Sequence, residues 1–354
     1  MSGDPYRPRR VLVTGIGTYW GSRVARALEA DPEVEVIVGL GVDPPEVELE
    51  RTEYVRADAS YSILARLIDA TRIDTVVHTH LVVDASQMPA RAVHEINVIG
   101  TMNLLAAVSA PDSAVRNLVV KSSTIVYGCS SGDPTWFQED TPPTRPPTTR
   151  IQRSLTEVEG YVRDFVVDNP HVNLTLLRFC KVLGEGLETP LTRALRLPLV
   201  PHLAGFDPRF QFVHSDDVVR AMLFALERHL SGVYNVAGDG VVPWSEVAAI
   251  CGKRTVPLTP YGTALAARLM RPVGIDLPDE ILELMRYGRG VDNRLLTAEG
   301  FEYRYTTAGA IDAFARALRL ERTVGNARPV YRYQRDVETF FRHSPAVIRD
   351  PEPT

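Results

Sequence analysis

Short apolar runs alternate with segments of helical length along the first half of the chain. The runs rich in Val, Ile and Leu cover residues 10–15, 34–40, 73–80, 116–123 and 172–178. The segments of helical length include residues 20–30, 60–70, 91–108 and 154–168. Continuous apolar strands that alternate with helices are typical of a parallel sheet whose two faces are covered by helices. The pattern therefore predicts a doubly wound α/β fold.

The pattern changes after residue 240, where the alternation gives way to helix-like stretches at 244–251, 261–271, 278–286 and 308–318. We expect a nucleotide-binding domain over 9–178, to which 206–238 return, and a smaller C-terminal substrate lobe from 179–205 and 239–325. Residues 326–354 are predicted to form a docked segment and a tail. Residues 129–150 are dense in Pro, Ser, Thr and Gly, which predicts a long surface loop of the kind that is usually functional.

Composition narrows the class of partner. The 354 residues are 45% hydrophobic and 23% charged, with a net charge of −5. This balance argues against nucleic acid or an anionic membrane as the main partner. No signal-peptide pattern and no run of about 18 apolar residues is present, so we expect a cytoplasmic protein. Three widely spaced cysteines predict neither a disulfide framework nor a metal site.

The segment VLVTGIGTYWGSRVARAL, residues 11–28, reads as a strand, a glycine-rich turn and a helix. Gly15 and Gly21 have the outer spacing of a dinucleotide-binding turn, while the middle glycine stands at Gly17 and Thr18 follows it. Such a turn lets a diphosphate approach the helix N-terminus, whose free N–H groups favour an anion. A strand-to-helix turn without a ligand is the alternative that these residues leave open.

The second strand lacks the acidic residue that usually holds the adenosine ribose. Its expected position is Leu40, and Asp43 follows three residues later in a Pro-rich turn. Gly39 and Gly41 are expected to leave room for a phosphate, but no arginine stands beside them. The choice between NAD and NADP is therefore not readable from this strand.

Several further segments share a family pattern. They are RAD at 56–58 with Ala59, VVHTH at 76–80, NVIGTMNLL at 97–105, VVKSSTIVYG at 119–128, LRFCKVLG at 177–184, FVHSDDVVRA at 212–221 and GVYNVAG at 232–238. In this order they resemble the extended short-chain dehydrogenase/reductase family, in its NAD-dependent epimerase/dehydratase branch, which includes UDP-galactose 4-epimerase. The resemblance implies a Rossmann-type sheet with a C-terminal substrate lobe.

The resemblance also implies ligands and site residues. It implies NAD or NADP as cofactor, with NAD favoured, a small-molecule substrate of the nucleotide-sugar type, and a homodimer formed through 91–108 and 154–168. The cofactor contacts that it implies are Gly15, Gly17, Thr18, Tyr19, Trp20, Gly21, Leu40, Asp58, Ala59, His78, Thr79, His80, Asn97, Lys121 and Phe179. The implied substrate contacts are Ser123, Thr124 and Lys181.

The chain departs from the family at the residues that carry its chemistry. In the family a tyrosine and a lysine four residues later transfer the proton and hold the cofactor ribose, and the aligned positions here are Ile151 and Leu155. Neither side chain can carry a proton. Ser123 matches the family's catalytic hydroxyl, and Lys121, two residues earlier in a strand, falls on the same face of the sheet. Lys121 could stand in for part of the missing lysine or simply extend along the sheet edge.

Three functions follow from these residues. The first is an atypical oxidoreductase or epimerase with a rearranged proton relay. The second is a non-catalytic dinucleotide-binding sensor or complex subunit. The third is a structural partner that no longer binds a cofactor, to which Thr18 and Leu40 lend weight.

Overall fold

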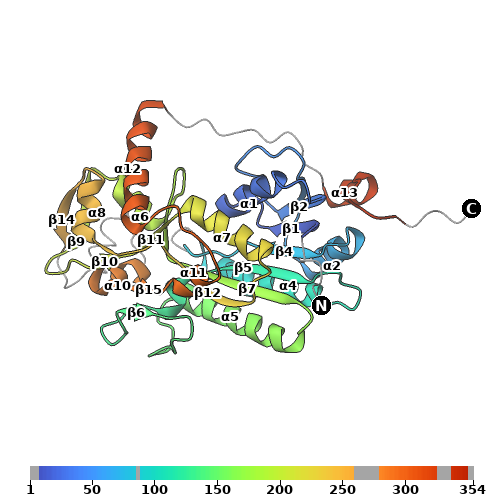
Figure 1. Ribbon diagram of the computed structural model, residues 1–354, viewed down its shortest axis with the longest axis horizontal. Helices are drawn as coiled ribbons and strands as arrows, with labels where there is room; N and C mark the ends of the chain where they lie inside the picture. The colour runs from blue at the N-terminus through green and yellow to red at the C-terminus, as the bar shows by residue number, and fades with distance from the viewer. Residues whose placement is uncertain (1–7, 85–87, 259–278, 325–335, 350–354) are drawn as a thin grey trace, which may run out of the picture.

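A seven-stranded, all-parallel sheet forms the centre of the molecule, with the strand order β12-β7-β5-β4-β1-β2-β3 (Figure 1). The computed structural model describes residues 8–84, 88–258, 279–324 and 336–349. The strands are β1 Arg10–Thr14, β2 Val36–Gly41, β3 Glu53–Arg56, β4 Thr75–His78, β5 Asn117–Ser123, β7 Asn173–Phe179 and β12 Gly232–Val236. This order confirms the predicted doubly wound α/β fold.

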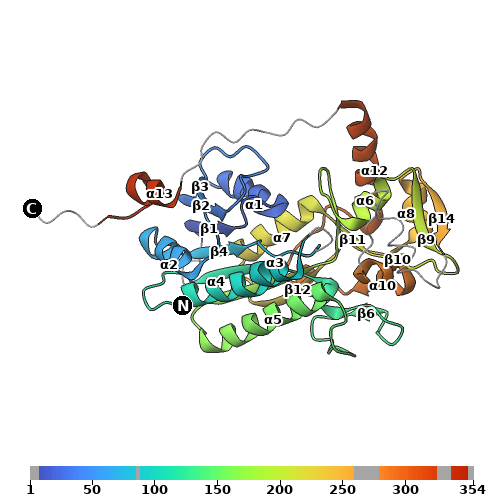
Figure 2. The same cartoon turned by 180° about the vertical axis from the view of Figure 1, so that it is seen from behind.

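Helices cover both faces of the sheet, which explains why the central strands are apolar on both sides (Figures 1 and 2). On one face lie α1 Tyr19–Glu29 and α7 Ser215–Glu227. On the other lie α2 Tyr61–Ala70, α3 Ala90–His94, η1 Glu95–Ile99, α4 Gly100–Val108 and α5 Arg150–Asp168. The stretch predicted as one helix over 91–108 is a helix with a π-helical turn, η1, at its centre.

The C-terminal lobe packs beyond the carboxyl ends of the strands (Figure 1). Its helices are α6 Pro190–Arg196, α8 Trp244–Ile250, α10 Asp279–Tyr287 and α12 Thr307–Val324, whereas α11 Arg294–Ala298 packs against β12 of the central sheet. In the described part of the chain, four two-stranded sheets lie outside the central sheet. They pair β8 Lys181–Leu183 with β11 Phe212–His214, β9 Leu199–Leu203 with β14 Arg254–Leu258, β10 Arg209–Phe210 with β13 Val242–Pro243, and β6 Trp136–Phe137 with β15 Gly290–Val291. Phe210, Trp244 and Phe314 lie in the lobe's own apolar core. The helix predicted over 261–271 lies outside the described residues.

The last described helix, α13 Val337–His343, packs on the edge strand β3. Phe340 and Phe341 are buried in the apolar cluster of the α2 face. The carbonyl oxygen of Ala346 accepts a hydrogen bond of 2.7 Å from the Arg10 guanidinium at the start of β1. An exposed sheet edge can pair with other chains, so a helix laid over β3 protects it.

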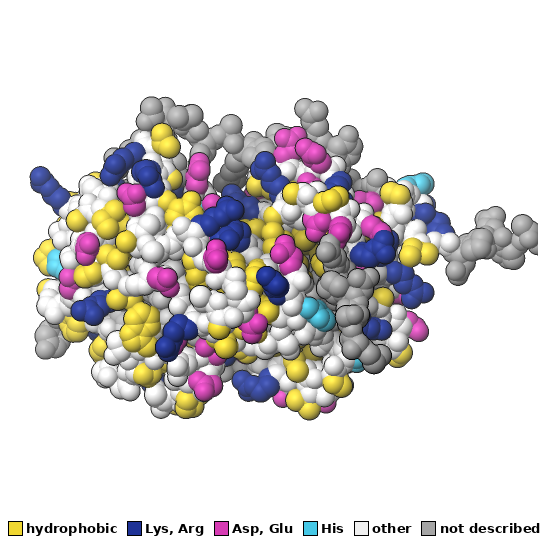
Figure 3. Space-filling view, viewed as in Figure 1, with side chains coloured by type: hydrophobic (Ala, Val, Ile, Leu, Met, Phe, Trp, Pro, Cys, Tyr) yellow, Lys and Arg dark blue, Asp and Glu magenta, His cyan; other side chains and the backbone are white. Residues whose placement is uncertain are grey.

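Charges of both signs are interspersed over the face drawn in Figure 3. No helix in the described part of the chain has the length and apolar character needed to cross a membrane. Within the same residues, no group of three or more His, Cys, Asp or Glu side chains is placed to hold a metal ion.

Candidate functional site

The glycine turn between β1 and α1 depends on two glycines. Gly15 adopts φ +73°, and a Cβ at Gly21 would lie 2.1 Å from the Gly15 carbonyl oxygen. Any side chain at residue 21 would therefore push α1 away from the turn. Thr18 caps α1: its Oγ1 accepts from the Gly21 N–H at 3.1 Å and donates to the Gly15 carbonyl at 2.7 Å. The other N–H groups of the first turn have no partner inside the helix and are available to an anion.

From the sequence we expect room for a phosphate beside Gly39 and Gly41, at the end of β2, and the structure shows none. Cβ atoms at Gly39 and Gly41 would lie 2.5 Å and 3.2 Å from side-chain atoms of Ile16, which is fully buried. The expected room beside these glycines is therefore wrong, because Ile16 fills it. Leu40 is buried, and its carbonyl accepts hydrogen bonds from the Gly15 and Ile16 N–H groups. The side chain of Leu40 thus belongs to the core, and the turn is tied to β2 through the backbone.

Asp43 lies against the glycine turn, where the sequence offered only a Pro-rich turn. A Cβ at Gly17 would be 2.4 Å from the Asp43 carbonyl oxygen, so only glycine fits at residue 17. His80 packs directly against Gly15, because a Cβ at Gly15 would be 2.8 Å from the Cβ of His80. Burial lowers the pKa of His80, and the negative charge of Asp43 opposes that shift. Asp43 and His80 therefore face each other across the turn.

Asp58 and Ala59 follow the end of β3, at the same edge of the sheet. Asp58 is exposed, and the Ala59 carbonyl accepts a hydrogen bond of 3.1 Å from Asn103. Asn97, in η1, is fully buried and binds both backbone groups of Val82, at 2.7 Å and 2.9 Å. Asn97 therefore holds the chain that leaves β4, and its side-chain amide is engaged by the backbone.

His78 at the end of β4 is neutral and structural in its contacts. Its Nδ1 lies 2.7 Å from Thr14 Oγ1, and its Nε2 lies 3.1 Å from Thr101 Oγ1. Thr101 donates its hydroxyl proton to the Asn97 carbonyl, so we assign the ring proton to His78 Nε2. Burial lowers the pKa of His78 to about 3. Thr79 is also engaged, because its hydroxyl donates to the Thr14 carbonyl at 2.8 Å.

Three of the expected site residues lie at the carboxyl end of β5: Lys121 and Ser123 in the strand and Thr124 directly after it. Ser123 is 7% exposed, and its Oγ accepts from the Ile125 N–H at 3.3 Å as the cap of η2 Thr124–Tyr127. Thr124 turns into a cavity between the sheet and the lobe. Lys121 is 3% exposed, and its Nζ lies 6.0 Å from the centre of the Trp20 ring. Burial lowers the pKa of Lys121 to about 8.

The first two turns of α5 carry Ile151 and Leu155, the residues expected from the sequence in place of the family's tyrosine and lysine. Ile151 and Leu155 are 2% and 0% exposed and lie in the apolar cluster of the α5 face. Both side chains are packed as core residues, and no proton carrier stands there.

One turn after Leu155, α5 carries a buried carboxylate. Glu159 pairs with Arg178 of β7 at 2.6 Å and accepts from Ser122 at 2.7 Å. Arg178 also donates to the Tyr127 hydroxyl at 2.7 Å. This network fixes α5 on the sheet and satisfies the charges on this face.

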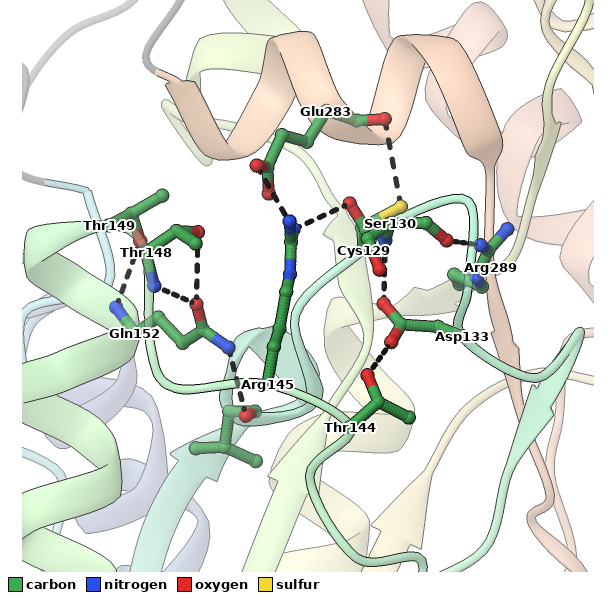
Figure 4. Close-up of polar contacts among 11 residues, drawn as sticks. Cys129, Ser130, Asp133, Thr144, Arg145, Thr148, Thr149, Gln152, Glu283 and Arg289 are labelled. Atoms are coloured by element: carbon green, nitrogen blue, oxygen red, sulfur yellow. Dashed lines mark hydrogen bonds and ion pairs between the residues drawn. The ribbon is translucent and has the colours of Figure 1, made fainter.

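A cavity lies between η2, the end of β7 and α10 (Figure 4). Phe179 ends β7 in the core, and Lys181, two residues later, lines the cavity. Arg289 also lines it and donates to the backbone carbonyls of Ser130, Tyr287 and Gly288. These carbonyls orient the guanidinium without neutralising it.

An acidic residue of α10 also reaches the cavity. Glu283 is paired with Arg145 at 3.2 Å (Figure 4). The two cations Lys181 and Arg289 therefore face a cavity whose acid already has a partner, and the cavity favours an anionic ligand.

Sequence reasoning missed most of the cavity wall. Gln152 is 4% exposed, accepts from the Thr148 N–H at 2.9 Å, and lines the cavity beside Ile151 (Figure 4). Thr149, the cap of α5, also lines the cavity, and Gln211 and Glu283 come from two other segments. The sequence could have indicated Gln152 as a site residue, because it directly follows the expected tyrosine position. The others had no such signal, because only the packed lobe brings them together.

The family model described as the NAD dependent epimerase/dehydratase family matches residues 11–237. The chain belongs to this family. An uncharacterized protein of Mycobacterium tuberculosis strain H37Rv is 32% identical over 325 residues, which cover 89% of this chain and 85% of that protein.

Two solved structures share the fold of this member of the epimerase/dehydratase family. MoeE5 in complex with UDP-glucuronic acid and NAD has a TM-score of 0.68 at 22% identity, covering 88% of this chain and 99% of its own. UDP-glucose 4-epimerase from Thermotoga maritima, solved with UDP-glucose, has a TM-score of 0.68 at 17% identity, with the same coverage of 88% and 99%. At these identities the likeness describes the fold.

Proposed function

We propose that this protein binds NAD or a closely related dinucleotide at the glycine turn and an anionic small molecule of the nucleotide-sugar type in the cavity, with little or none of the family's usual proton transfer. The observation that carries the proposal is the turn itself. Gly15 and Gly21 bring α1 against the end of β1, so its N-terminus faces the carboxyl edge of the sheet.

The residues present fit a dinucleotide. The turn has the backbone form that a diphosphate needs, Ile16 and Asp43 close the adenosine side, and the buried Lys121, which has no ion pair among the described residues, lies beneath. A bound nicotinamide would supply a hydride acceptor or donor. In this proposal Ser123 Oγ holds a substrate oxygen, while the buried apolar side chains of Ile151 and Leu155 exclude water and move no proton. Loss of a proton-transfer group costs about 100- to 10,000-fold in rate, so turnover by the usual route would be slow.

The substrate class rests on the charge of the cavity and on relatives. Lys181 and Arg289 favour a phosphorylated ligand, and the polar lining of Thr124, Gln152 and Gln211 suits hydroxyl groups. MoeE5 was solved with UDP-glucuronic acid and the Thermotoga enzyme with UDP-glucose, which supports the same class for this chain.

A second candidate is a non-catalytic dinucleotide sensor or complex subunit. The apolar burial of Ile151 and Leu155 favours it, because the protein has filled the place of the proton carriers instead of replacing them with other polar groups. A homodimer is proposed for either function. Ile99 and Met102 on the η1–α4 helix and Val166 and Val167 on α5 are apolar and exposed, on elements that lie side by side (Figure 2).

Isothermal titration with NAD, NADH, NADP and NADPH, followed by UDP-glucose and UDP-glucuronic acid, tests the proposal. We expect at least one dinucleotide to bind, and turnover, if present, to fall at least 100-fold in Ser123→Ala. Ser245→Ala in the lobe is the control, since Ser245 bonds to Asp207 at the start of α8, away from the turn and the cavity. Dinucleotide binding without turnover would select the sensor. Failure of all four dinucleotides to bind would overturn both.

A further inference from the structure

Lys121 is a largely buried lysine whose ammonium has no ion-pair partner among the described residues. It is 3% exposed, and no residue in the described ranges makes a hydrogen bond or ion pair with its ammonium. Lys253, by contrast, has hydrogen-bond acceptors for its ammonium, which donates to the carbonyls of Arg196 and Leu197 at 3.2 Å and 2.8 Å. Burying a charge without compensation is costly, so Lys121 destabilises the protein unless something else supplies the compensation.

The position of Lys121 indicates what that compensation is. Lys121 lies two residues before Ser123 and therefore faces the α1 side of β5. Its nearest aromatic contact, Trp20, is the second residue of α1 and stands directly after the glycine turn. The ammonium thus lies between the end of β5 and the N-terminus of α1, where the helix dipole already favours an anion.

The charged groups of the surrounding elements do not neutralise it. Several charged groups on or beside these elements have other partners, as in the pairs Arg23–Glu46, Glu159–Arg178 and Asp217–Arg220. His78 on β4 is the nearest titratable group, and it stays neutral because burial lowers its pKa to about 3. His80 faces Asp43 instead. The anionic partner of Lys121 is therefore absent from the described part of the chain.

We infer that Lys121 holds the diphosphate of the bound dinucleotide and that it does so by taking up a proton, so that binding and protonation of this amine are one linked event. This inference rests on the proposed function and adds to it a pH control of cofactor affinity. It also gives the glycine turn a cation from the sheet beneath it.

The sign of the linkage follows from burial. Because burial lowers the pKa of Lys121 to about 8, the free protein holds a charged ammonium below that pH and a neutral amine above it. The diphosphate favours the ammonium and raises its pKa in the complex. Affinity is therefore constant below about pH 7 and falls about tenfold per pH unit above pH 8, where each binding event takes up close to one proton.

Isothermal titration of the full chain with NAD, in buffers of different ionisation enthalpy between about pH 6.5 and 9.5, measures both quantities. NAD is used because the 2′-phosphate of NADP titrates itself. His80 does not interfere, since its pKa is lowered from 6.5, and Tyr19 does not, since burial raises its pKa above 10.0. Proton uptake that rises with pH toward one per site supports the inference.

Two variants separate charge from shape. Lys121→Met keeps the length of the side chain, and we expect it to weaken NAD binding about 10- to 100-fold at neutral pH and to abolish proton uptake. Lys121→Arg keeps the charge at every pH, so binding should persist without the alkaline decline. Lys253→Met, whose lysine bonds to backbone carbonyls in the lobe, is the matched control and should bind as the wild type does.

The fluorescence of Trp20 gives a second readout without NAD, because the ammonium lies 6.0 Å from its ring. A transition near pH 8 in the wild type, absent from Trp20→Phe and Lys121→Met, is expected. NAD binding that is equally tight in Lys121→Met and wild type, or that takes up no proton at any pH, would overturn the inference and leave the proposed function standing. No binding by any dinucleotide would overturn both.

Discussion

The glycine turn before α1 and the first two turns of α5 lie at the same edge of one sheet, yet they keep very different parts of the family's machinery. The turn retains its backbone form, with Gly15 at φ +73° and no space for a side chain at Gly21. The first two turns of α5 have Ile151 and Leu155 packed into the core. Anion binding by a helix end needs only backbone, which the fold itself requires. Proton transfer needs particular side chains, which the fold does not require.

The two faces of the sheet differ in the same way. On the α5 face, Glu159, Arg178 and Ser122 satisfy one another. On the α1 face, Lys121 is buried without any such partner in the described ranges. Paired groups of this kind serve stability, whereas an uncompensated buried charge indicates a ligand. This contrast is the reason for proposing the ligand site on the α1 face.

The largest expected effect comes from restoring the family's lysine on α5. Leu155→Lys would place a charge in a fully buried apolar site, and we expect it to lower the free energy of unfolding by about 3–5 kcal/mol. Urea denaturation followed by circular dichroism measures this loss. Leu155→Met, which conserves volume, should cost less than about 1.5 kcal/mol. A stable Leu155→Lys protein would show that this position opens to solvent and that the contrast between α1 and α5 is false.

The next effect has the opposite sign and lies on the α1 face. The pKa of Lys121 is lowered from 10.5 to about 8, so the unfolded chain binds more protons between these values and stability rises with pH there. Below about pH 8 the full penalty is present, and Lys121→Met should raise the free energy of unfolding by about 2–3 kcal/mol in the absence of ligand. The gain should shrink above pH 8 and vanish beyond 10.5. Denaturation across this pH range measures it, and a variant less stable than the wild type at pH 7 would contradict it.

The smallest effects compare two helical glycines. Gly21→Ala should lower stability by about 1–3 kcal/mol and weaken dinucleotide binding, because its Cβ would meet the Gly15 carbonyl at 2.1 Å. Gly160, in α5, has no atom within 4 Å of its Cβ position. Gly160→Ala should raise stability by about 0.5–1 kcal/mol through helix propensity and leave binding unchanged. Thermal unfolding with and without NAD tests both, and similar behaviour of the two variants would remove the special status of the turn.

Sequence patterns predicted the central sheet well where the strands are long and apolar. Asn117–Ser123 is buried at every position and was expected as a strand. The edge strand Glu53–Arg56 was not, because only its two middle residues, Tyr54 and Val55, are buried and its ends are polar. The helix pattern over 91–108 was read correctly, but the π-helical turn at Glu95–Ile99 leaves no mark in the apolar spacing.

The candidate site was predicted in part. The family motifs pointed to the carboxyl edge, where Gly15, Ser123 and Lys181 lie at the ends of separate strands. They could not show that Ile16 fills the space beside Gly39, or that Asp43 folds back onto Gly17, because both depend on how β2 meets the turn. Arg289 enters the cavity from the lobe, and no local pattern predicts that approach.

The sequence by itself determined the alternation of strands and helices, the glycine turn, and the absence of tyrosine and lysine at residues 151 and 155. Each of these depends on periodicity, backbone sterics or residue identity within a few neighbouring positions. Only the tertiary structure decided that Lys121 has no partner in the described ranges and that Lys181 and Arg289 share one cavity. Charge compensation and cavity walls are made by segments far apart in the chain, so they exist only once the sheet and the lobe have packed together.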